Sequence, residues 1–101
     1  MQTQMLGNLI VERRLRSTTR SLRLLREELR ISEEHLQQIA EEAGDAEIRS
    51  LVSETPLAAR DYQEVERHRV VLAAQVRNLY QQIGELERQR DALLDRLRHR
   101  G

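Results

Sequence analysis

The sequence predicts an all-α fold, a long antiparallel two-helix coiled-coil hairpin that forms a dimeric bundle with a second copy. Three observations support this prediction. Leu, Ala, Glu, Arg and Gln, which all favour helices, dominate the 101 residues, and there is a single proline. Apolar residues recur at alternating three- and four-residue spacings over two long segments, a pattern typical of paired helices. Gly44 and Pro56 lie between the two segments, so the chain can turn back there.

The first heptad pattern predicts one helix over about residues 8–43, because no proline or glycine interrupts this segment. Residues 1–7 are expected to fray. Two core positions are polar, Thr18 and Ser32, so this apolar stripe is the weaker of the two. The predicted core positions are Val11, Leu15, Thr18, Leu22, Leu25, Leu29, Ser32, Leu36, Ile39 and Ala43.

The second heptad pattern predicts a helix over about residues 56–98. Arg69 and Arg90 occupy core positions, where their long stems cover apolar surface while the charged groups reach water. Alternatively, they select one alignment of the helices at a cost in stability. The predicted core positions are Tyr62, Val65, Arg69, Leu72, Val76, Leu79, Ile83, Leu86, Arg90, Leu93 and Leu97.

Residues 44–56 form the predicted connector of a single helical-hairpin domain that spans residues 1–101. Gly44 is expected to close the first helix in a left-handed conformation, and Asp45 to cap a short helical segment at the tip of the hairpin. Thr55 is suited to cap the second helix, with Pro56 as its first residue. One side of the short segment carries Ile48, Leu51 and Val52.

Two alignments of the helices fit the heptad patterns. In the first, Ser32 lies opposite Arg69 and Leu22 lies opposite Leu79. In the second, shifted by one heptad, Leu22 lies opposite Leu86 and the connection tightens toward residue 55. Both alignments remain open at the level of sequence.

A second set of apolar residues lies outside the heptad core, where one helix–helix contact cannot cover it. Scattered exposed apolar residues are ordinary in proteins. A second line of them along a helix favours self-association into a homodimer, or a contact with another helical protein. This line comprises Ile10, Leu24, Ile31, Val70, Tyr80 and Leu94, of which Leu24, Ile31, Tyr80 and Leu94 are the candidate interaction residues.

Charge is unevenly distributed along a chain whose net charge is zero. Residues 1–30 carry seven arginines against three glutamates, and residues 67–101 carry eight arginines against four acids. Residues 31–66 carry two arginines against ten acids. A hairpin would therefore have a basic open end and an acidic tip, which favours pairing of opposite ends. Nucleic acid is a poor candidate partner, because acids interleave with the arginines and no aromatic stacking platform is present.

Residue types that support enzyme chemistry are scarce. The chain has no cysteine or lysine, and its three histidines, His35, His68 and His99, are too far apart in sequence for a helical metal-binding pair. It contains no glycine-rich phosphate loop and no nucleophile motif. We expect a bacterial, cytoplasmic, non-enzymatic protein without cofactor, metal site, signal peptide or membrane span. Arginine is used at all 17 Lys or Arg positions of the chain, as is typical of proteins encoded by GC-rich genomes.

One short segment resembles a known family. A helical hairpin with Ala43-Gly44-Asp45 near its turn, followed by Ala46-Glu47, is similar to the coiled-coil arm of bacterial transcript cleavage factors. The resemblance covers the hairpin plan and these five residues. In that family, carboxylates at the tip reach through a channel of RNA polymerase and help hold a catalytic magnesium ion. The resemblance implies that role for Asp45 and Glu47.

Two functions follow from these patterns. The first is a structural or adaptor role in which helix faces bind other proteins. The alternative is a transcription-associated factor that acts at RNA polymerase through its acidic tip.

Overall fold

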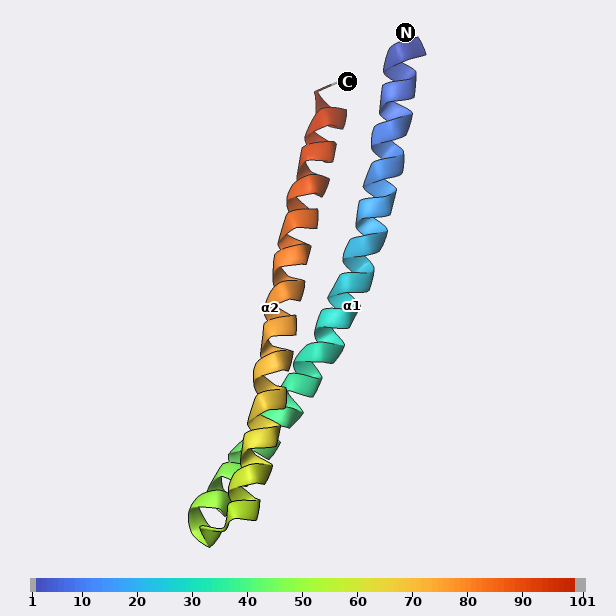
Figure 1. Cartoon of the computed structure of the whole chain (residues 1–101). Coiled ribbons are helices and arrows are strands. Elements are labelled where there is room, and N and C mark those ends of the chain that lie inside the picture. Colours follow the sequence, from blue (N-terminus) through green and yellow to red (C-terminus); the bar gives the residue numbers. More distant parts are fainter. Residues whose placement is uncertain (1, 100–101) are drawn as a thin grey trace. The chain divides into compact units, whose positions relative to one another are not determined.

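The computed structural model describes the backbone of residues 2–99 and the side chains of residues 5–99. The described residues form two helices, α1 (Gln2–Ser53) and α2 (Pro56–Arg98), with no strand between them (Figure 1). The all-α helical hairpin expected from the heptad patterns is confirmed. The predicted bounds of α2 are also confirmed, whereas α1 begins before residue 8 and ends ten residues beyond Ala43.

The predicted break at Gly44 is wrong, because α1 continues through this residue. Gly44 is exposed, its φ is not positive, and a Cβ built on it meets nothing within 4 Å. A glycine inside a helix costs about 1 kcal/mol relative to alanine, which a long packed helix can tolerate. The heptad pattern also continues to Ala46, which is 1% exposed. Residues 45–52 are therefore the last turns of α1 and not a separate helical segment.

The end of α1 is closed by local hydrogen bonds. The Ser53 hydroxyl donates to the Arg49 carbonyl over 2.6 Å, and the Glu54 N–H donates to the Ser50 carbonyl over 3.2 Å. Glu54 then adopts a φ of 50°, and it is the one non-glycine residue with positive φ in the described chain. This left-handed residue, which sequence reasoning assigned to Gly44, ends the helix.

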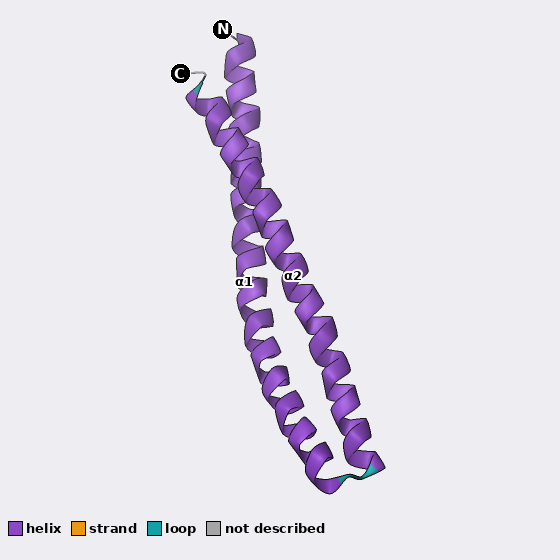
Figure 2. Cartoon of the chain, turned by 90° about the vertical axis from the view of Figure 1, so that its left-hand side faces the viewer, coloured by secondary structure: helices purple, strands orange, loops and turns teal. Residues whose placement is uncertain are grey.

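The start of α2 has the predicted capping arrangement. The Thr55 hydroxyl accepts a hydrogen bond from the Ala58 N–H over 3.2 Å, as expected of an N-cap residue. Pro56 is the first helical residue, a position where its missing N–H costs no helical hydrogen bond. The connection is therefore only Glu54 and Thr55, the short loop in Figure 2.

The chain divides into two compact units, each built from antiparallel helical segments. Unit 1 contains α1 up to Glu28 and α2 from Leu79. Unit 2 runs from Leu29 to Asn78 and includes the turn. Apart from Ala46, every buried residue is a predicted core position. The buried residues of unit 1 are Val11, Thr18, Leu22, Leu79, Ile83 and Leu93, and those of unit 2 are Ala43, Ala46, Leu72 and Val76.

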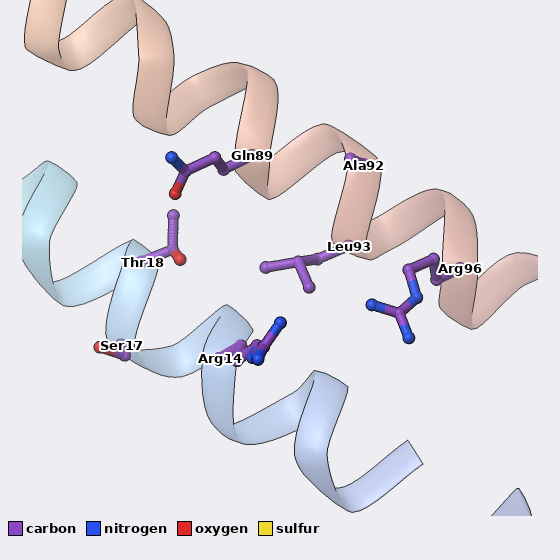
Figure 3. Close-up of a pocket in the computed structure, with 7 residues that line it drawn as sticks. All are labelled: Arg14, Ser17, Thr18, Gln89, Ala92, Leu93 and Arg96. Carbon is purple, nitrogen blue, oxygen red and sulfur yellow. The ribbon is translucent and has the colours of Figure 1, made fainter. Parts of the chain in front are cut away.

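The helices follow the second of the two alignments expected from the sequence. In unit 2, Tyr62 is hydrogen-bonded to Glu47, so these positions are level across the pair. In unit 1, Thr18 faces Gln89 (Figure 3). Both contacts lie within one residue of the heptad-shifted alignment, because a two-residue connection starts the pairing directly at the turn. The first alignment is wrong, and Arg69 pairs within α2 with Glu66.

Candidate functional site

The predicted interaction residues are exposed to different degrees. In unit 1, Leu24 is 66% and Tyr80 53% exposed, whereas Leu94 is half-buried beside the helix contact. In unit 2, Ile31 is 53% exposed. Leu24, Tyr80 and Ile31 thus remain accessible outside the core. Leu24 and Tyr80 belong to unit 1 and Ile31 belongs to unit 2, so the three residues do not form one surface within a single unit.

Asp45 and Glu47 lie in the last part of α1 and not at the turn, because α1 extends to Ser53. Both residues are exposed. The Glu47 carboxylate accepts a hydrogen bond from the Tyr62 hydroxyl, and its negative charge is the main cause that raises the pKa of Tyr62. Glu47 therefore takes part in the helix pairing of unit 2. Among residues 5–99, no three His, Asp or Glu side chains gather to hold a metal ion.

The most exposed apolar cluster is at the turn, and we call it the turn surface. Its residues are 61–80% exposed. A groove of about 440 Å³ runs over part of it, with Ala58 and Asp61 in its lining. Sequence reasoning grouped three of the four residues but missed Leu57, whose position directly after Pro56 was the available signal. The turn surface consists of Ile48, Leu51, Val52 and Leu57.

A second apolar cluster occupies the first turns of α1, and we call it the N-terminal surface. Its residues are 52–67% exposed. A groove of about 330 Å³ beside Leu9 is lined by Arg13, Arg16 and Arg20. Of this cluster, only Ile10 was assigned from the sequence to the apolar line outside the heptad core. The N-terminal surface consists of Met5, Leu6, Leu9 and Ile10.

A pocket of about 430 Å³ lies between the two helices of unit 1 (Figure 3). Leu93 reaches between the helices, and the guanidinium groups of Arg14 and Arg96 both lie on one side of the Leu93 side chain. Ser17, Thr18 and Gln89 supply neutral polar groups. Guanidinium groups bind carboxylates and phosphates through paired N–H donors, so this pocket favours an anionic group over a cationic one.

The two units carry opposite net charge. The sequence of unit 1 contains eleven arginines against seven acidic residues, a net charge of +4. Unit 2 contains six arginines against ten acidic residues, a net charge of −4. An ion pair in unit 1 joins the helices directly, from Arg26 to Glu87 over 3.2 Å. This exposed pair contributes little to stability, so the main consequence of the charges is the field around each unit.

One arginine at a predicted core position is held by a local ion pair. Arg69 Nε donates to Glu66 Oε2 over 2.8 Å, and a second N–H of Arg69 reaches the other carboxylate oxygen. The hydrogen bond from Arg69 is the main cause that lowers the pKa of Glu66, and the same bond raises the pKa of Arg69. The pair keeps the charged end of Arg69 satisfied while its stem lies against the helix contact.

Comparisons with known proteins give no relative for this chain. No family model matches the sequence, and searches of curated proteins and of solved structures return no significant match. Within the described residues, neither helix has an apolar segment of the length needed to cross a bilayer. The exposed surfaces of the two units are therefore the features from which a function is inferred.

Proposed function

We propose that this chain is a non-enzymatic structural or adaptor protein that binds other proteins through exposed apolar helix surfaces. The observation that carries the proposal is the turn surface, where Val52 is 80% exposed and its three neighbours are at least 61% exposed. Contiguous exposed apolar residues of this kind mark interaction sites, because covering them removes apolar area from water.

The turn groove suits one kind of contact. Ile48, Val52 and Leu57 give it apolar walls, and its lining carries one negative charge, Asp61, and one positive charge, Arg49. Such a groove fits the apolar side of an amphipathic helix. A bacterial cytoplasmic setting belongs to this proposal, supported by a chain without cysteine whose only basic side chains besides histidine are arginines.

Photocrosslinking tests this function. A photoreactive amino acid at Val52, in full-length protein produced in cells, should give discrete adducts with other polypeptides. The same amino acid at Gln75, an exposed polar position of α2 in unit 2, is the matched control. Adduct yields at position 52 no higher than at position 75 would refute the proposal.

The alternative function is a transcription-associated factor acting through acidic residues near the turn. Asp45 is the exposed acid available for this role, since Glu47 is engaged by Tyr62. Asp45→Arg should then abolish an effect of the protein on transcript cleavage by RNA polymerase in vitro, without a change in helicity. An adaptor that uses the turn surface should tolerate Asp45→Arg and lose its photocrosslinks on Val52→Gln. The two functions thus predict opposite sensitivities at neighbouring positions.

A further inference from the structure

We propose that the turn surface of one copy binds the N-terminal surface of a second copy of the same chain. This inference rests on the proposed function and names the partner of its main surface. Because two different surfaces meet, two copies either form the contact twice around a two-fold axis or form it once and leave one surface of each copy open.

The apolar parts of the two surfaces match in kind. Each surface contains four apolar, non-aromatic side chains that are more than half exposed. Each also has a groove beside its aliphatic residues, of about 440 Å³ at the turn and about 330 Å³ near the start of α1. Residues spaced three and four apart, such as Leu6, Leu9 and Ile10, form the ridge of a helix that enters such a groove.

The charged residues around the two surfaces are complementary. Arg13, Arg16 and Arg20 line the groove of the N-terminal surface. Arg16 has a long contact of 3.9 Å with Glu12, so this basic groove is only weakly neutralised within its own helix. At the turn, Asp61 lines the groove and the exposed Glu54 adjoins it. Their negative charges outweigh that of Arg49, which also lines the turn groove.

The net charges of the two units also favour a second copy of the chain as the partner. Unit 1, which bears the N-terminal surface, has a net charge of +4, and unit 2, which bears the turn surface, has −4. Two copies that bring unit 1 against unit 2 gain long-range attraction, whereas pairing of like units is repulsive. A second copy therefore satisfies both the apolar and the electrostatic requirements of the turn surface.

Two double variants and a control separate the surfaces. Ile48→Gln with Val52→Gln removes the turn surface, and Leu6→Gln with Leu9→Gln removes the N-terminal surface. Gln favours helices, and the four residues are exposed, so helicity measured by circular dichroism should be kept. The matched control is Val70→Gln with Val71→Gln, which replaces two exposed valines elsewhere on α2.

Sedimentation velocity on the full-length chain measures the association. The wild type should associate as concentration rises, and each of the two surface variants should weaken association by at least about tenfold, since apolar area is lost from the contact. The control should associate like the wild type. Raising the salt from about 50 mM to about 500 mM should also weaken association, because it screens the charges.

A mixing experiment gives the most specific result. The turn variant keeps its N-terminal surface, and the N-terminal variant keeps its turn surface, so an equimolar mixture should regain a one-to-one complex. If the contact joined two turn surfaces instead, the N-terminal variant would self-associate like the wild type and mixing would add nothing. Either that result or a wild type that stays monomeric at every concentration overturns the inference.

Failure of this inference can be told from failure of the proposed function. A monomeric wild type that gives adducts with a different protein from position 52 would refute pairing of copies and support an adaptor. A monomeric wild type without position-specific adducts would refute both.

Discussion

The hydroxyl of Tyr62 on α2 donates a hydrogen bond to the carboxylate of Glu47 on α1. This contact links the two helices of unit 2 near the turn and adds a polar interaction beside the apolar core of that unit. The nearby charge of Glu47, with smaller contributions from burial and Glu66, raises the pKa of Tyr62.

Replacing Glu47 with Gln should lower the pKa of Tyr62 toward its ordinary value of 10.0, because the largest cause of the shift is removed. A raised folded-state pKa means that the neutral phenol stabilises the fold below pH 10 and that this contribution is lost as pH rises further. Ultraviolet titration of the phenolate measures the effect, with Tyr80→Phe as the background so that one tyrosine reports. An unchanged pKa in the Glu47→Gln variant would contradict the contact.

The pair of Glu66 and Arg69 predicts a pH dependence at the acidic end. Because Arg69 lowers the folded-state pKa of Glu66, the pair stabilises the fold above the ordinary carboxyl value of 4.5 and loses this effect as pH falls through the lowered pKa. Arg69→Gln should raise the Glu66 pKa, measured by NMR titration of its side-chain carboxyl carbon. Arg77→Gln is the control, and an equal response in both variants would refute the pairing.

Gly44→Ala should stabilise the protein by about 0.5–1 kcal/mol, because the helix continues through this residue and alanine restricts the unfolded chain. The added methyl group enters open space. Chemical denaturation followed by circular dichroism measures the change. A loss of stability would mean that Gly44 adopts the left-handed conformation predicted from sequence. Gly84→Ala is the comparison within α2, where the new Cβ meets only the end of the Arg88 side chain at 3.5 Å.

Thr55→Ala should destabilise the hairpin by about 1 kcal/mol, because the Ala58 N–H loses its side-chain acceptor. Thr55→Ser keeps a hydroxyl at the same place and should retain most of the stability. Thermal unfolding of the two variants and the wild type gives the comparison. Equal melting temperatures for Ala and Ser at this position would show that the cap contributes nothing.

Much of the fold could be predicted because heptad spacing directly reports which side of a helix is covered. Leu22, Leu72 and Leu79 are buried as expected, and so is the polar Thr18. The error at Gly44 came from treating a glycine as a stop signal, although the next core position, Ala46, continued the pattern. Helix ends depend on small free-energy differences that the packing of a long helix can override.

The alignment and the surfaces were harder to predict. Two registers placed leucine opposite leucine equally well, and only the length of the connection, fixed by Glu54 and Thr55, distinguishes them. The turn surface was partly foreseen in Ile48, Leu51 and Val52. The N-terminal surface was not, because a chain end gives no sequence signal that it stays helical. Leu94 was expected among the accessible residues, but it is half-buried.

The two-residue connection also sets the order in which the hairpin should fold. Contacts such as Glu47 with Tyr62 close a short loop, whereas a core contact at Val11 closes most of the chain, at a greater entropic cost. We therefore expect a transition state in which unit 2 is formed around the turn and unit 1 is still open. Leu72→Ala should then slow folding, and Leu93→Ala should chiefly speed unfolding, so the chain should close from its turn toward its two ends.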